Sequence, residues 1–142
     1  MKFIRITTLD KGWHDTDELL LHVVFQLLVD FMEKECPEKV TDWSFDQAHR
    51  KAWKDIKRLG KWWQNTRPNR TSPIEEKSIR RPPVVVKKVS GTNYSEIIQP
   101  DRKKYSNYYR ALKKHMKLEE KWYREDQLML HKLIEVRKYL WT

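Results

Sequence analysis

Residues 19–32 read LLLHVVFQLLVDFM, and this stretch decides the fold. Its apolar side chains cover most of the circumference of a helix, which is typical of a central helix buried in a bundle. The helix is predicted to run from about residue 16 to residue 35, because Asp15 and Glu18 have the spacing of a capping box and Pro37 follows its end. We therefore predict an all-α fold, a three- or four-helix bundle around this helix, in a single domain covering residues 1–142.

Polar residues interrupt this apolar surface at intervals of four. They fall in one narrow stripe, since a helix has ~3.6 residues per turn. The stripe consists of Glu18, His22, Gln26 and Asp30. It can belong to a buried structural network, face solvent, or form part of a site.

A second, amphipathic helix is predicted to begin at Ser44, which forms a capping box with Gln47, and to end at residues 65–68, where Pro68 follows. Apolar and aromatic residues recur at spacings of three and four and form its core face. They are Phe45, Ala48, Ala52, Trp53, Ile56, Leu59 and Trp63. Basic residues occupy most of the remaining positions.

A third helix is predicted to begin near Asp101 and can continue to Leu140, because no glycine or proline follows Pro100. Forty helical residues would span about 60 Å, longer than a domain of this size. The helix is therefore expected either to break near residues 117–121 or to project and pack on a partner. A homo-oligomer through this long C-terminal helix is one form of the second alternative.

Residues 67–100 are predicted to form a long basic linker or arm. They hold five of the six prolines, and 7 Lys+Arg against 3 acidic residues. Residues 84–86 and 97–98 are aliphatic and flank a turn-forming stretch at 90–93, so the linker can form a short β-hairpin. Connections of this length are usually functional or disordered.

Composition excludes several classes of protein. Three glycines argue against a glycine-rich phosphate loop, and one cysteine excludes a disulfide framework or a multi-cysteine zinc site. No apolar run approaches the ~18 residues of a membrane span, and the first residues lack the apolar stretch of a signal peptide. We expect a soluble intracellular protein without a membrane association.

Charge is distributed unevenly along the chain, whose formal net charge is +10. Residues 1–43 carry 5 Lys+Arg against 9 Asp+Glu, whereas residues 44–142 carry 25 against 11. A basic surface favours an anionic partner such as nucleic acid, a nucleotide or an acidic protein. A solvated lysine-rich surface is the alternative interpretation.

Basic and aromatic residues on the second helix, the linker and the third helix are the predicted binding residues. Cations neutralise phosphates and aromatic faces stack on bases. The candidates are Lys54, Lys57, Arg58, Lys61, Trp62, Arg67, Arg70, Arg110, Lys113 and Lys114. Trp62 lies off the main core stripe that ends at Trp63, so either one of the pair is exposed or both are in the core.

Acidic residues provide an alternative, enzymatic hypothesis. Glu125 and Asp126 lie within an apolar stripe of the third helix, and carboxylates there are costly unless they are paired. If His22, Asp30, Glu125 and Asp126 converge, the three acids could bind Mg²⁺ or Mn²⁺ and hydrolyse a nucleotide phosphoanhydride. The non-catalytic alternatives are a stripe in solvent or a buried network satisfied by Arg137, Lys132 or tryptophan indole N–H groups. The complete acidic pattern of the helical nucleotide pyrophosphohydrolases is absent.

Three blocks of the sequence resemble a group of small proteins from tailed bacteriophages. The blocks are FQLLVDF at residues 25–31, KWW followed by RP-x-R at residues 61–70, and the C-terminal block ED..ML..LI..R..LWT at residues 125–142. The resemblance implies a phage-encoded protein acting in the bacterial host cytoplasm or in a virion, but supplies no activity.

The expected function is that of a non-enzymatic accessory protein without a cofactor. Its expected partner is anionic: nucleic acid, a nucleotide signal, or a component of host defence, which would make the protein an anti-defence factor. A metal-dependent nucleotide phosphohydrolase and a structural component of the virion are the alternatives.

Overall fold

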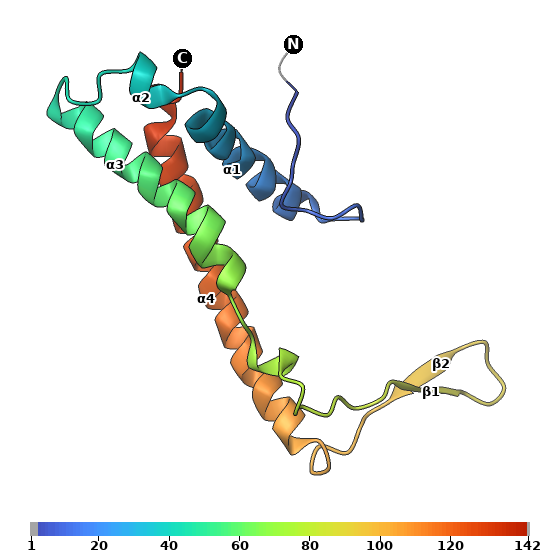
Figure 1. Cartoon of the computed structure of the whole chain (residues 1–142). Helices are drawn as coiled ribbons and strands as arrows, with labels where there is room; N and C mark the ends of the chain where they lie inside the picture. Colours follow the sequence, from blue (N-terminus) through green and yellow to red (C-terminus); the bar gives the residue numbers. More distant parts are fainter. Residues whose placement is uncertain (1–2, 142) are drawn as a thin grey trace. The chain divides into compact units, whose positions relative to one another are not determined.

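The computed structural model describes residues 3–141 and is rich in helix (Figure 1). The helices are α1 (Thr16–Lys34), α2 (Pro37–Val40), α3 (Gln47–Lys61) and α4 (Ser106–Val136), and the strands are β1 (Val85–Lys88) and β2 (Ser95–Ile98). A π-helical turn η1 (Trp62–Thr66) and 3-10 turns η2 (Arg67–Asn69), η3 (Pro73–Glu75) and η4 (Arg137–Tyr139) complete the order. The predictions of a helical protein and of a short hairpin are confirmed.

The chain divides into two compact units, which are described separately. The first unit takes the residues up to Arg70 together with those from Glu125 onward, and the second unit takes Thr71–Arg124. Helix α4 contributes its C-terminal part to the first unit and its N-terminal part to the second.

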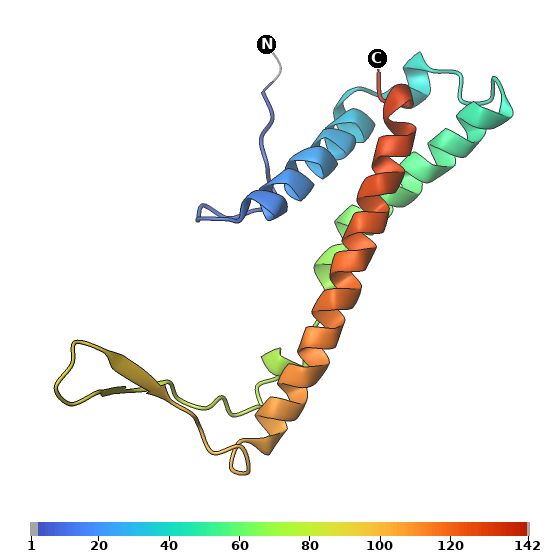
Figure 2. The ribbon, with the colours of Figure 1, turned by 180° about the vertical axis from the view of Figure 1, so that it is seen from behind.

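The core of the first unit is formed by α1, α3, η1 and the end of α4. Figures 1 and 2 show α1 and α3 flanking the C-terminal part of α4. Phe25, Leu28 and Ile56 are fully buried. The other core residues are Leu21, Phe31, Trp43, Ala52, Leu59, Trp62, Trp63, Met129, Leu133 and Val136.

Helix α1 ends within one residue of the predicted boundary, but two details of the prediction are wrong. The Asp15 side chain accepts no capping hydrogen bond. The helix is not buried all round, since Leu20 is 56% exposed and Leu27 is 39% exposed. The apolar circumference therefore includes a face that residues 3–141 leave uncovered.

Helix α3 begins three residues later than predicted. Asp46, not Ser44, caps it, and the Asp46 carboxylate accepts a hydrogen bond from the His49 backbone N–H at 2.7 Å. The Ser44 hydroxyl instead donates to Asp42 at 2.6 Å. Phe45 lies before the helix and is largely exposed, so it does not belong to the core face.

Helix α4 is continuous through residues 117–121, where a break was one of the two alternatives predicted. Its 31 residues correspond to about 46 Å at ~1.5 Å per residue. It begins at Ser106 rather than near Asp101, because Asp101 instead accepts hydrogen bonds from the backbone N–H groups of Lys103 and Lys104 in a turn.

The hairpin of the second unit is antiparallel, with Val85 opposite Ile98 and Val86 opposite Ile97. Gly91, with φ of +78°, forms part of the connecting turn, where a left-handed backbone favours glycine. All eight strand residues are exposed, so the described residues cover neither face of this small sheet.

Candidate functional site

Three of the predicted binding residues and two of the predicted acidic residues meet in one cluster within the first unit. The Trp62 indole N–H donates to Glu125 Oε1 at 2.8 Å. The Arg70 guanidinium donates to Glu125 Oε2 at 2.9 Å and to Asp126 Oδ1 at 2.7 Å. Arg67 donates to both oxygens of Asp126, at 3.3 and 3.4 Å. We refer to Trp62, Arg67, Arg70, Glu125 and Asp126 as the acid–arginine cluster.

This cluster is largely shielded from water. The side chains of Arg70 and Asp126 are each 15% exposed. Each guanidinium also lies over an indole ring, Arg67 over Trp63 at 5.0 Å and Arg70 over Trp62 at 5.7 Å from the centroid. Two arginines thus neutralise the two carboxylates that the sequence placed within an apolar stripe, and one indole N–H adds a further hydrogen bond.

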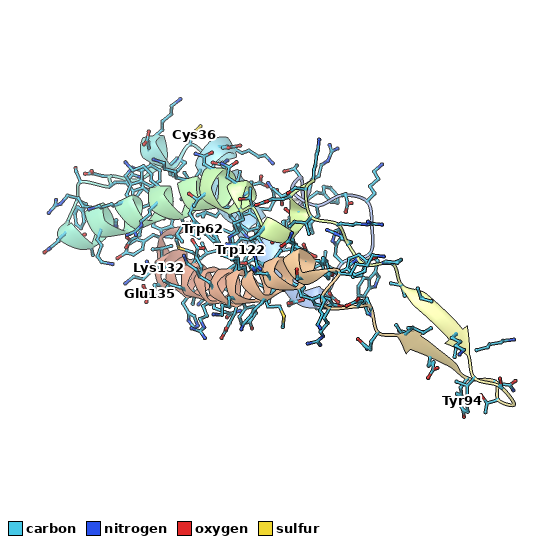
Figure 3. All side chains as sticks on the ribbon, turned by 90° about the horizontal axis from the view of Figure 1, so that it is seen from below. Cys36, Trp62, Tyr94, Trp122, Lys132 and Glu135 are labelled. Atoms are coloured by element: carbon cyan, nitrogen blue, oxygen red, sulfur yellow. The ribbon has the colours of Figure 1, made fainter. Side chains whose placement is uncertain are left out.

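The cluster corrects the interpretation of Trp62. Trp62 is 4% exposed and Trp63 is 3% exposed, so both are core residues and neither offers a ring face to a base. They are consecutive, and a regular helix would direct them about 100° apart. The π-helical turn, closed by the Arg67 N–H bonded to the Trp62 carbonyl, begins at this pair. Figure 3 shows Trp62 between α3 and α4.

Three residues of the polar stripe of α1, His22, Gln26 and Asp30, form a buried network with the N-terminal segment, whereas Glu18 is exposed and lies beside His14. Thr8 Oγ1 lies 2.6 Å from His22 Nδ1, and the Thr7 backbone N–H donates to Gln26 Oε1 at 3.2 Å. The Gln26 amide donates in turn to Asp30 at 3.0 Å. Sequence reasoning did not identify the two threonines, since nothing in an isolated Thr-Thr pair indicates a partner fourteen or more residues away.

The surroundings of His22 favour the neutral form of its imidazole. Burial lowers the pKa of its imidazole below the ordinary value, and the positive charge of Arg67 lowers it further. Its ring also contacts Trp63 edge-on, with centroids 4.8 Å apart. The network and the acid–arginine cluster are therefore coupled electrostatically within the first unit.

The residues of the enzymatic hypothesis are each held by other groups. Asp30 pairs with Lys34 at 2.7 Å, while Glu125 and Asp126 pair with arginines. Within residues 3–141, no group of three or more His, Cys, Asp or Glu side chains is placed to hold a metal ion. From the sequence, the partners expected for Glu125 and Asp126 are Arg137, Lys132 and tryptophan indoles. An indole N–H does bond Glu125, but the cations that pair with the two acids are Arg67 and Arg70.

The remaining predicted binding residues lie on two exposed basic faces. On α3, Lys54, Lys57, Arg58 and Lys61 are exposed and share one side of the helix, opposite the buried Ile56. Lys57 lies over the Trp53 ring at 5.4 Å from its centroid. In the described part of the chain, none of these four cations forms an ion pair with a carboxylate.

The second basic face belongs to the N-terminal part of α4, in the second unit. Successive positions at helical spacing are cationic and exposed over residues 110–121. They are Arg110, Lys113, Lys114, Lys117 and Lys121. The nearby acids have other partners: Glu119 pairs with His115 at 3.1 Å and Glu120 pairs with Arg124. Among the described residues, no carboxylate pairs with any of the five, and we call this surface the α4 basic face.

An unpredicted contact holds the linker to α4 on a different side of the helix. Ser72 Oγ lies 2.7 Å from His115 Nδ1, and Glu119 contacts the other ring nitrogen. Ser72, His115 and Glu119 thus form a row of contacts like that of a catalytic triad. Ser72 is, however, only 6% exposed, and its hydroxyl caps η3 by accepting a hydrogen bond from the Ile74 N–H. The contact is therefore a buried structural one that orients the start of the linker.

No helix within residues 3–141 is both long enough and apolar enough to cross a bilayer. Compared with models of known families, with curated proteins and with solved structures, the chain matches none of them.

Proposed function

We propose that this is a phage-encoded, non-enzymatic accessory protein that binds nucleic acid through the α4 basic face. The observation that carries the proposal is the set of five exposed cations on one side of α4, none paired with a carboxylate of the described residues. Such a surface attracts a polyanion, because each phosphate contact releases condensed counterions from the nucleic acid.

The dimensions of the face suit a phosphate backbone. Residues 110–121 extend over about 17 Å of helix, at ~1.5 Å per residue. Duplex DNA carries one charge per ~1.7 Å of its axis, and its major groove admits an α-helix. Since the face consists of lysines and one arginine, contacts to phosphate dominate and binding tolerates many sequences.

The basic face of α3 supports the same function from the first unit. The α3 basic face lies on the proposed helical bundle, in which α1, α3 and the end of α4 share one core. Arg67, Arg70 and Trp62 play no direct part, because their hydrogen-bonding groups are engaged by Glu125 and Asp126. An enzymatic role for those two acids would first require the arginines to release them.

The experiment measures binding of fluorescent duplex DNA, single-stranded DNA and RNA by anisotropy over a series of salt concentrations. We expect affinity to fall steeply with salt. The variant Arg110→Gln/Lys114→Gln/Lys117→Gln should reduce the slope of log affinity against log salt by about 2–3, or ~0.9 for each duplex phosphate that the protein no longer neutralises.

A matched control removes three exposed cations elsewhere, as Arg5→Gln/Lys11→Gln/Lys39→Gln. It lowers the net charge equally, so it should change the slope much less if the α4 basic face is the interface. Absence of binding at low salt, binding that does not depend on salt, or equal effects of the two triple variants would contradict the proposal.

A further inference from the structure

An apolar groove lies on the first unit between α1 and the end of α4. Its volume is about 290 Å³. It is lined by Leu20, Val24, Leu27, Leu130, Leu133, Ile134, Arg137 and Leu140. Leu20 and Ile134, one from each helix, are 56% and 58% exposed. Contiguous apolar surface with exposed leucine and isoleucine side chains is a candidate interaction site.

The spacing of the lining residues is that of a helix-packing surface. Residues 20, 24 and 27 of α1 and residues 130, 134 and 137 of α4 both recur at i, i+4 and i+7. Each series therefore follows one face of its helix, and neighbouring helices pack on such stripes. The groove offers two helical faces side by side to a third or fourth helix.

Charged residues stand at opposite ends of this groove. Figures 1 and 2 show α1 and the C-terminal part of α4 running in the same direction. The start of α1 carries the exposed Asp17, whereas the far end of the groove carries Arg137, followed by Lys138. A surface that is acidic at one end and basic at the other is complementary to itself when turned through 180°.

We propose that a second copy of this chain covers the groove, with α1 and α4 of the two copies packed antiparallel about a twofold axis. The apolar stripes then bury each other, and Asp17 of each copy lies against the basic end of the groove in the other. The four helical segments from two copies form one bundle across the interface. The inference is independent of nucleic-acid binding.

The test measures the oligomeric state of the whole chain by sedimentation equilibrium, after nuclease treatment so that residual nucleic acid does not bridge copies. We expect a dimer for the wild type. The variant Leu20→Glu/Ile134→Glu should raise the dimer dissociation constant at least tenfold, since it buries four charges in the interface. Because both sites are exposed in one copy, its circular dichroism should match that of the wild type, and its melting temperature should fall only by the contribution that dimerisation makes.

Leu128→Glu provides the matched control. Leu128 is 53% exposed on α4 but does not line the groove, so this variant should dimerise as the wild type does. A charge reversal tests the twofold arrangement separately: Asp17→Arg should weaken the dimer, and adding Arg137→Asp in the same chain should restore it.

Several outcomes would overturn the proposal. One is a wild type that is monomeric at a protein concentration of about 100 μM, because only a weak dimer dissociates at that concentration. Another is a groove variant that dimerises as tightly as the Leu128→Glu control. A dimer that survives Leu20→Glu/Ile134→Glu but is lost in Val86→Ser/Ile97→Ser would assign the interface to the exposed hairpin instead.

Discussion

Arg67 and Arg70 and the cations of the α4 basic face have the same chemistry but different surroundings. The two arginines donate hydrogen bonds to carboxylates and lie over indole rings, and Arg70 is 15% exposed. Arg110 and its neighbours on α4 face solvent. A partly buried cation that has a carboxylate partner holds the fold together, whereas an exposed cation without one is available to a phosphate.

Removing Arg70 should have the largest effect on stability. Arg70→Ala leaves Glu125 and Asp126 partly buried without their shared partner, and we expect a loss of about 3 kcal/mol in the free energy of unfolding. Urea denaturation measures it. Arg110→Ala, the control on the α4 basic face, should change that free energy by less than about 0.5 kcal/mol. Equal free energies of unfolding for the two variants would contradict the distinction between paired and unpaired cations.

The second prediction concerns the pKa of His22, which Arg67 helps to lower. In an NMR titration the wild-type imidazole should titrate below 6.5, its ordinary value. Arg67→Gln should raise that pKa, because it removes a positive charge directed toward the core. Lys113→Gln, an exposed control, should leave it unchanged, and a shift of equal size in the two variants would show that Arg67 has no special position.

The same pKa determines the pH dependence of stability. Because the folded imidazole has a lower pKa than the unfolded one, the unfolded chain binds the proton more readily. The contribution of neutral His22 is therefore complete above about pH 6.5 and is lost as the pH falls through the folded pKa. Urea denaturation of His22→Gln over the same pH range should show a weaker dependence than the wild type.

The smallest effect on stability is expected on the α4 basic face itself. Lys114→Ala/Lys117→Ala should leave the melting temperature unchanged, or raise it slightly because alanine favours helix and repulsion between cations is relieved. The salt slope of DNA binding should nevertheless fall by about 2. A large loss of helix content would mean that these lysines serve the fold, as Arg70 does.

Local sequence patterns were sufficient for several elements and for the basic faces. The length of α1 follows from an apolar run that ends before Pro37, and the hairpin follows from aliphatic pairs around Gly91. The exposed cations of α3 and α4 could be predicted from helical periodicity, because exposure depends on which helix face the apolar residues occupy.

Local patterns failed where contacts outside the pattern determine the position or partner of a side chain. Ser44 has the capping-box spacing, yet Asp46 caps α3. Trp62 lies off the helical core stripe, yet the π-helical turn and Glu125, 63 residues away, keep it in the core. Thr8 and His22 are likewise joined only when the N-terminal segment lies along α1.

The sequence by itself determined the helical class, the amphipathic faces and the excess of positive charge, because these depend on residues a few positions apart. Only the tertiary structure decided which charges are neutralised. Arg67 and Arg70 differ from Arg110 in the carboxylates that the fold brings to them, and pairing over 55 or more residues leaves no periodic signal. The 30 Lys and Arg residues thus include cations that stabilise the protein and cations that are exposed on its two basic faces.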